Sequence, residues 1–214
     1  TAQSPDIYMQ LVEAANPTYA SVPEIVDKVF EEMAPVFGRR YRLFEYYGAE
    51  DAEDVIVCMG SGANVVHETV NYLNARGSKV GVLKVRLFRP WSVKHFLEVL
   101  PKTVKRVAVL DRCKDPGAQG EPLFLDTCTS FSNRLSEIHP MVIGGRYGLG
   151  SKDFTPGQVM AVFENLRSEK PVEGFTVGIQ DDVSMRSLPM LPEPDTVPSS
   201  IYQAIMWGMG SDGT

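Results

Sequence analysis

The segment 60–64, GSGAN, has residue types and spacing that suggest binding chemistry. It follows a short apolar run and precedes an amphipathic stretch. A glycine turn between a strand and a helix can bind anions through free backbone N–H groups. However, Val65 takes the place of the third glycine of a dinucleotide-binding fingerprint, and Val85-Arg86 stands where an acidic residue would hold a ribose. We therefore favour a tight turn that needs small residues over a nucleotide site.

The segment 111–122, DRCKDPGAQGEP, places Lys114 near several carboxylates, and such a set can move protons during catalysis. Cys113 stands between two basic residues, which would lower the pKa of its thiol. No histidine lies nearby in the sequence to serve as its base. Mixed charges with proline and glycine are also typical of a rigid loop, so we interpret this segment as an interface loop without a catalytic residue.

The segment 86–92, RLFRPWS, combines two arginines with a tryptophan. It could hold a carboxylate or a phosphate, or it could anchor a neighbouring domain through arginine and aromatic contacts. We favour the second interpretation. The predicted interface residues are Arg89, Trp91, Lys114 and Glu121.

The cysteines and histidines are too widely spaced in the sequence to indicate a disulfide framework or a metal site. They are Cys58, Cys113, Cys128, His67, His95 and His139. We expect reduced thiols, as in a cytosolic type of compartment, and no bound metal. The net charge of −6 makes nucleic acid an unexpected partner. No apolar run approaches the ~18 residues that cross a membrane, so no membrane partner is expected.

Apolar β-branched runs alternate with amphipathic stretches through the middle of the chain. Strands are predicted at 54–60, 79–85, 106–111, 141–147 and 175–179, and helices at 63–77, 92–100, 122–135 and 155–167. This alternation predicts an open, mostly parallel α/β sheet with helices on both faces, over roughly 46–180. The polar loops would then share the carboxyl edge of the sheet, where α/β folds bind ligands.

The flanks of this unit have different patterns. Residues 1–45 hold one predicted helix at 21–38, with Ser21 as its N-terminal cap. Residues 186–200 are rich in proline and predict an extended linker or a strap across a surface. The last eight residues, WGMGSDGT, form a glycine-rich turn after a short apolar run, which is a weak phosphate-loop pattern.

Five segments carry a family resemblance. They are GAEDAEDVIVCMGSGANVVHETVNYL, KVGVLKVRLFRPWSV, VAVLDRCKDPGAQGEPLFLD, VIGGRYGLGSKDFTP and FTVGIQDDV. In this order they resemble the second domain of pyruvate:ferredoxin oxidoreductases. The beginning of the chain resembles the end of that enzyme's first domain, and YQAIMWGMGSDGT resembles the opening of its third. The family's subunit is far longer, so we expect an internal segment of a multidomain enzyme.

The resemblance implies an oxidoreductase that oxidatively decarboxylates pyruvate with coenzyme A to acetyl-CoA and CO₂. Electrons would pass to ferredoxin or flavodoxin, or to NADP if a flavin module is fused. The implied cofactors are thiamine diphosphate, Mg²⁺ and [4Fe-4S] clusters, none of them expected within this chain. The implied partners are the other domains and a homodimer mate. The expected location is the cytoplasm, or an organelle such as a hydrogenosome, mitochondrion or plastid.

The resemblance also implies a domain plan. Residues 1–45 would end the thiamine-binding domain, 46–185 would form a second domain like the carboxyl-terminal domain of transketolase, 186–200 would be a linker, and 201–214 would begin the third domain. The second domain would assemble the enzyme without an active site of its own. The implied contacts near coenzyme A and thiamine are Gly208, Gly210, Ser211, Asp212, Gly213 and Thr214.

Two alternatives belong to other classes. One is a non-catalytic domain of the same ancestry in another reductase, such as the flavoprotein part of a sulfite reductase; the WGMGSDGT segment argues against it. The other is the carboxyl-terminal domain of a thiamine-dependent dehydrogenase or transketolase, which the sequence matches only at the level of the fold.

Overall fold

The computed structural model describes residues 3–132 and 135–210. Its elements follow in the order α1 (Pro5–Glu13), α2 (Asn16–Phe37), β1 (Phe44–Gly48), β2 (Asp54–Met59), α3 (Gly62–Asn74), β3 (Val80–Val85), α4 (Val93–Glu98), β4 (Arg106–Asp111), α5 (Pro122–Ser130), β5 (Met141–Tyr147), a 3-10 turn at Leu149–Ser151, α6 (Pro156–Arg167) and β6 (Phe175–Val177). All five predicted strands and all four helices of the central unit are present, which confirms the expected α/β class.

One six-stranded sheet organises these elements, with the strand order β1-β3-β2-β4-β5-β6. Strands β2 to β6 are parallel to their neighbours, and only the edge strand β1 is antiparallel, pairing with β3. The chain moves outward from β2 in both directions, so the crevice typical of such folds lies between the carboxyl ends of β2 and β4.

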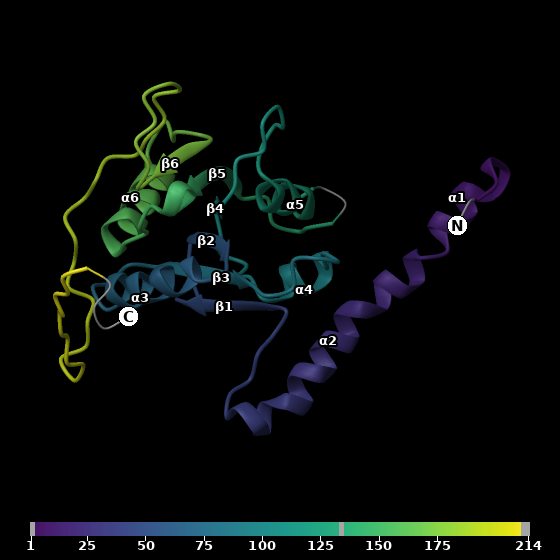
Figure 1. Cartoon of the computed structure of the whole chain (residues 1–214), viewed down its shortest axis with the longest axis horizontal. Coiled ribbons are helices and arrows are strands. Elements are labelled where there is room, and N and C mark those ends of the chain that lie inside the picture. Colours follow the sequence, from purple (N-terminus) through teal and green to yellow (C-terminus); the bar gives the residue numbers. More distant parts are fainter. Residues whose placement is uncertain (1–2, 133–134, 211–214) are drawn as a thin grey trace.

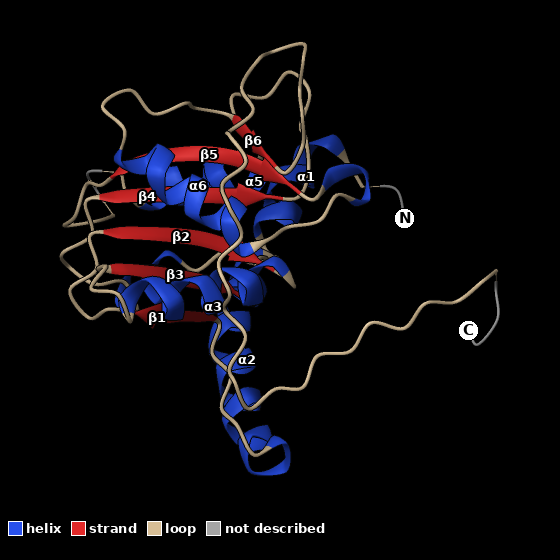
Figure 2. Cartoon of the chain, turned by 90° about the vertical axis from the view of Figure 1, so that its left-hand side faces the viewer, coloured by secondary structure: helices blue, strands red, loops and turns tan. Residues whose placement is uncertain are grey.

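The sheet separates two hydrophobic cores (Figures 1 and 2). Helices α3 and α6 cover one face, and α4 and α5 cover the other. Ile56 and Cys58 of β2 point to the first core, whereas Val55 and Val57 point to the second. Because both faces are covered, the central strands are mostly apolar, with charged residues near their ends, instead of alternating with polar residues.

Helix α6 begins as the sequence predicts. Thr155 is the N-cap, Pro156 takes the first helical position, and Thr155 and Gln158 form a capping box. Val162 and Phe163 are among the residues of this helix that pack into the first core.

Several predictions for the flanks and helix ends were wrong. Helix α2 begins at Asn16, not at Ser21, whose hydroxyl instead donates to the carbonyl of Thr18 within the helix. The short helix α1 and the strand β1 were not predicted. Strand β1 is hydrogen-bonded to β3, with Phe44 opposite Val85. Helix α5 ends at Ser130, and residues 133–134 of the longer expected helix lie outside the described residues.

The proline-rich segment 186–200 runs beside the sheet edge and α6. Ser187 forms a bridge with Thr176 of β6, and Leu188 is buried in the first core. At the other end of the chain, α1 and α2 form an arm that extends away from the sheet (Figure 1). Helix α2 contacts the domain through Val26 and Phe30, which pack against the second core.

Candidate functional site

Tyr147, at the end of β5, fills the space beside the turn that follows β2. Its side chain is buried, and its hydroxyl donates to the carbonyl of Met59 over 3.3 Å. A methyl group at Gly62 would lie 2.5 Å from that hydroxyl oxygen and 2.7 Å from the ring. The small residue at the start of α3 is therefore required by the Tyr147 ring, which agrees with the predicted tight turn.

Asp111, the last residue of β4, is turned inward. Its two carboxylate oxygens accept the backbone amides of Leu123 and Phe124, each over 3.1 Å. Burial raises the pKa of this carboxyl group, and the two amide hydrogen bonds oppose that shift. Asp111 thus caps helix α5 across the intervening loop and holds that loop closed.

Glu121 and Arg146 form the most buried charged pair of this edge. Arg146 Nε donates to Glu121 Oε1 over 2.6 Å, and the same guanidinium donates to the carbonyl of Gly174 over 2.9 Å. Lys114 approaches Glu121 from the solvent side, with its Nζ 3.7 Å from the carboxylate. These charges compensate one another within the domain.

Cys113 lies in the same loop, and its surroundings differ from those expected. Partial burial raises the pKa of its thiol, and the nearby carboxylates of Asp111 and Glu121 raise it further. The adjacent basic residues in the sequence therefore do not produce a thiolate, and the prediction of a lowered pKa was wrong.

Arg89 and Trp91 lie on the other face of the sheet. Arg89 is about half exposed and forms a 2.5 Å ion pair with Asp126 of α5. The Trp91 indole packs against Phe44 and Phe96, with ring centroids 5.0 and 5.1 Å away, and donates to the hydroxyl of Ser130 over 2.8 Å. Trp91 thus stabilises its own domain through these contacts.

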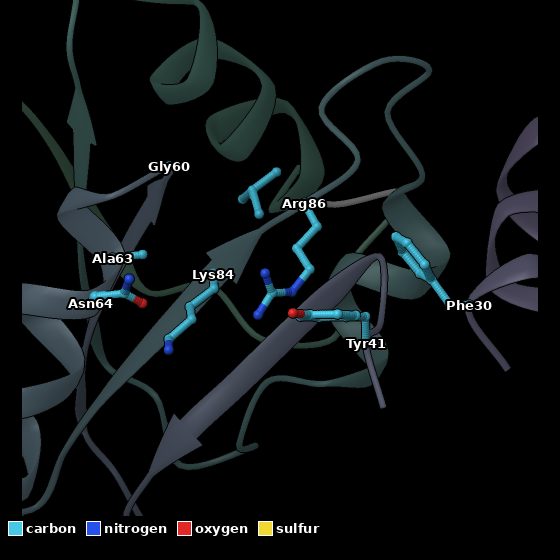
Figure 3. Close-up of a pocket in the computed structure, with 8 residues that line it drawn as sticks. Phe30, Tyr41, Gly60, Ala63, Asn64, Lys84 and Arg86 are labelled. Atoms are coloured by element: carbon cyan, nitrogen blue, oxygen red, sulfur yellow. The ribbon is translucent and has the colours of Figure 1, made fainter. Parts of the chain in front are cut away.

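A pocket of about 520 Å³ lies at the carboxyl ends of β2 and β3. Its lining combines cations and aromatic rings with the turn that begins α3 (Figure 3). The residues are Phe30, Tyr41, Gly60, Ala63, Asn64, Lys84, Val85 and Arg86. Sequence reasoning missed Lys84 and Tyr41. A lysine within the otherwise apolar run 79–85 was the available signal.

The cysteines do not converge. Cys58 lies inside buried β2, Cys113 in the loop after β4, and Cys128 in α5. Over residues 3–132 and 135–210, no group of three or more His, Cys, Asp or Glu side chains is arranged to hold a metal ion. The thiols therefore do not fit an iron–sulfur cluster. In the described part of the chain, no helix is both long and apolar enough to cross a membrane.

The glycine-rich end of the chain is placed only in part. Gly208 and Gly210 lie in an exposed segment, and Gly210 has a positive φ of 73°. The other four predicted contact residues, Ser211 to Thr214, lie outside the described residues. No described element packs over 205–209, since Ile205, Met206, Trp207 and Met209 are each at least 82% exposed.

These features define a class: an open, mostly parallel α/β domain whose carboxyl-edge charges are largely satisfied within the domain. Comparison with known proteins gives the family. The protein-family model "Pyruvate:ferredoxin oxidoreductase core domain II" matches residues 52–159. The chain therefore belongs to the pyruvate:ferredoxin oxidoreductase family.

Relatives match along the whole chain. It is 55% identical to the pyruvate:ferredoxin oxidoreductase of Moorella thermoacetica over 214 residues, which is all of this chain and 18% of that protein. It is 53% identical to the mitochondrial pyruvate dehydrogenase [NADP(+)] of Euglena gracilis, covering 12% of that protein. The chain thus spans less than a fifth of the length of these relatives.

A solved structure of 2-oxoglutarate:ferredoxin oxidoreductase from Magnetococcus marinus is also similar. It is 27% identical, with a TM-score of 0.42, and the match covers 69% of this chain and 24% of that one.

Proposed function

We propose that this chain works as the second-domain segment of an enzyme that oxidatively decarboxylates pyruvate with coenzyme A to acetyl-CoA and CO₂. The observation that carries this proposal is the 55% identity to the Moorella thermoacetica enzyme over the entire chain. In this role the segment is an inter-domain and subunit-assembly module without its own active site. Ferredoxin or flavodoxin would receive the electrons.

The geometry of the carboxyl edge supports an assembly role. Tyr147 fills the space beside the β2 turn, Asp111 is committed to capping α5, and Glu121 is paired with Arg146. These groups hold backbone and side chains of the same domain, so their hydrogen-bonding capacity is used in folding and not in catalysis. Thiamine diphosphate, Mg²⁺ and the iron–sulfur clusters would belong to other parts of the enzyme.

The domain plan predicted from the sequence is part of this proposal. Residues 1–45 would end the thiamine-binding domain, 46–185 would form the second domain, 186–200 the linker, and 201–214 the start of the third domain. Exposed apolar side chains support contacts outside the second domain: Val36 of α2 is 74% exposed and Trp207 is 93% exposed. Gly208, Gly210, Ser211, Asp212, Gly213 and Thr214 would lie near coenzyme A and thiamine.

Electron-acceptor choice would lie outside this segment. Relatives named for ferredoxin and for NADP⁺ are almost equally similar to it, at 55% and 53% identity. The same comparison leaves either the cytoplasm or an organelle as the proposed location, since the Euglena gracilis relative is named as mitochondrial.

A chimera tests the proposal. The matching segment of the Moorella thermoacetica enzyme is replaced by this chain, and pyruvate-dependent reduction of a viologen dye is measured with coenzyme A, thiamine diphosphate and Mg²⁺. We expect an assembled chimera that retains activity, and no turnover by this chain alone. An assembled but inactive chimera, or turnover by the isolated chain, would contradict the proposed role.

A further inference from the structure

The residues of strand β3 change from apolar to charged along the face that lies beneath α3. Val80 and Val82 point into the first hydrophobic core, and alternate residues of a strand share a face. Lys84 therefore follows on the same face at the carboxyl end, and Arg86, just beyond the strand, lines the same pocket. The two valines lie in the core, and the two cations that follow them in the sequence line the pocket.

The side chains around this pocket surround an open space from several directions. In Figure 3, Lys84 extends from β3 and Arg86 from the residue just after it, with Asn64 of α3 on one flank and Tyr41 on the other. Gly60 brings the backbone at the start of α3 to the same pocket. The side chain of the N-cap residue Ser61 forms no capping hydrogen bond with α3. The positive end of the α3 dipole therefore adds to the charge of the two cations.

Lys84 is a buried cation whose hydrogen-bond partner is a ring nitrogen, not a carboxylate. The residue is only 8% exposed, and its Nζ lies 2.6 Å from His67 Nδ1. Among the ion pairs of the described residues, none includes Lys84. Burial lowers the pKa of the ammonium group even though the charge of Glu45 raises it. The positive charge is therefore incompletely compensated, and such charges are costly unless an anion is near.

Arg86 is held in place beside the pocket. Its guanidinium forms a 2.5 Å ion pair with Glu45 and lies over the Tyr41 ring, 4.5 Å from the centroid. This pair leaves Arg86 about one-third exposed. Glu45 is the principal carboxylate that competes with an incoming anion, with exposed Glu68 acting from farther away.

From these contacts we propose that the pocket binds a phosphate group, with Lys84 and Arg86 as its charged ligands and Asn64 and the start of α3 as its neutral donors. A phosphate offers oxygens in several directions, which matches donors that converge from a strand and a helix. The pocket is larger than a phosphate ion, and the Phe30 and Tyr41 rings leave space for an organic group. This proposal stands whether or not the chain acts in pyruvate oxidation.

The probe is inorganic phosphate, added to the ¹⁵N-labelled 214-residue chain at constant ionic strength, with amide shifts followed by NMR. We expect saturable shifts at residues 60–64 and 84–86. Lys84→Gln should weaken binding by about tenfold, because a charge-assisted hydrogen bond is lost. Lys102→Gln is the matched control, since it removes the same charge from a side chain that is 89% exposed and far along the chain from the pocket.

Glu45→Gln removes the competing carboxylate and should strengthen phosphate binding about threefold or more. A gain of affinity cannot arise from unfolding, so this variant keeps the proposal testable if Lys84→Gln fails to fold. Adenosine monophosphate serves as a second probe; tighter binding than inorganic phosphate would identify an organic phosphate, and equal binding the free ion. The proposal is overturned if no saturable shifts occur, if acetate gives the same shifts at the same concentration, or if Glu45→Gln weakens binding.

Discussion

The carboxylate of Glu193 accepts the backbone amide of Gly157 over 2.8 Å, and its other oxygen accepts the hydroxyl of Thr155 over 2.5 Å. Glu193 lies in the proline-rich strap, whereas Gly157 belongs to the first turn of α6. A residue 36 positions away thus completes the cap of this helix. The strap is fixed to the domain by this contact and by buried Leu188.

Glu193→Ala should destabilise the domain by about 1 kcal/mol, because α6 loses an acceptor at its N-terminus. Urea unfolding measures this change. Limited proteolysis should also cut the 186–200 strap faster in the variant. Glu169→Ala is the control, since it removes an exposed carboxylate just beyond the other end of α6. Equal stability of the two variants would show that the cap contributes nothing.

Asp111→Ala should cost about 2 kcal/mol of unfolding free energy, since two backbone amides at the start of α5 lose their acceptor. Asp111→Asn keeps the shape and one acceptor oxygen, so its loss should be smaller. Chemical denaturation of both variants gives the comparison. Faster hydrogen exchange at Leu123 and Phe124 in Asp111→Ala would locate the effect, and unchanged exchange there would refute the capping role.

Gly62→Ala should destabilise the domain by about 1–3 kcal/mol, even though alanine favours helices over glycine by about 1 kcal/mol. The added methyl group meets the Tyr147 hydroxyl and ring, which are buried and cannot move freely. Thermal and urea unfolding measure the loss. In a Tyr147→Ala background the same substitution should become neutral or stabilising; an additive double variant would show that the two residues do not interact.

The fold should lose stability below neutral pH through His67. Burial, followed by the charge of Lys84, lowers the pKa of this imidazole from its usual value of 6.5. As pH falls below about 6.5 the unfolded chain binds the proton first, so stability present above that pH is lost until the folded-state pKa is reached. Urea unfolding at several pH values, together with NMR titration of the ring, tests this expectation.

Two variants serve as controls for the His67 effect. His67→Gln should lose less stability between pH 7.5 and the folded-state pKa than the unaltered chain. Lys84→Gln removes one cause of the shift and should move the pKa of His67 upward. A ring that titrates at or above 6.5 in the unaltered chain would contradict the prediction.

Charge reversal at the exposed interface residues should impair assembly of the chimeric enzyme before it changes the KM for pyruvate. Arg89→Glu and Lys114→Glu are the suitable variants, since these side chains are about half exposed. Glu121→Lys is unsuitable, because it would leave Arg146 without its buried partner and unfold the domain. Lys102→Glu, in the loop before β4 at the opposite edge of the sheet, is the control. Normal assembly with a raised KM would count against an interface role.

Two of the four predicted interface residues have partners within the domain. Trp91 and Glu121 are used within the domain, by the aromatic cluster around Phe96 and by Arg146 respectively. An interface role stays a prediction for all four residues, of which Arg89 and Lys114 are about half exposed. The role of Gly208, Gly210, Ser211, Asp212, Gly213 and Thr214 near coenzyme A and thiamine also stays a prediction.

The sequence by itself determined the α/β alternation, the parallel strands and the start of α6. These features depend on local signals: apolar β-branched runs, helical spacing, and the Thr155-Pro156 cap. The order of the five resembling segments also indicated the family, because many residues in a row must agree. Neither kind of signal depends on contacts between residues that are far apart in the chain.

Only the tertiary structure decided what occupies the carboxyl edge. The pairing of β1 with β3, the Tyr147 ring against Gly62 and the Glu193 cap of α6 all join residues that are far apart in the chain. The pocket of Lys84 and Arg86 likewise needs Tyr41, which α2 and the following loop bring back to the sheet. Hydrophobic periodicity records whether a residue is buried but not against what, so these contacts depend on strand order and on the closure of long loops.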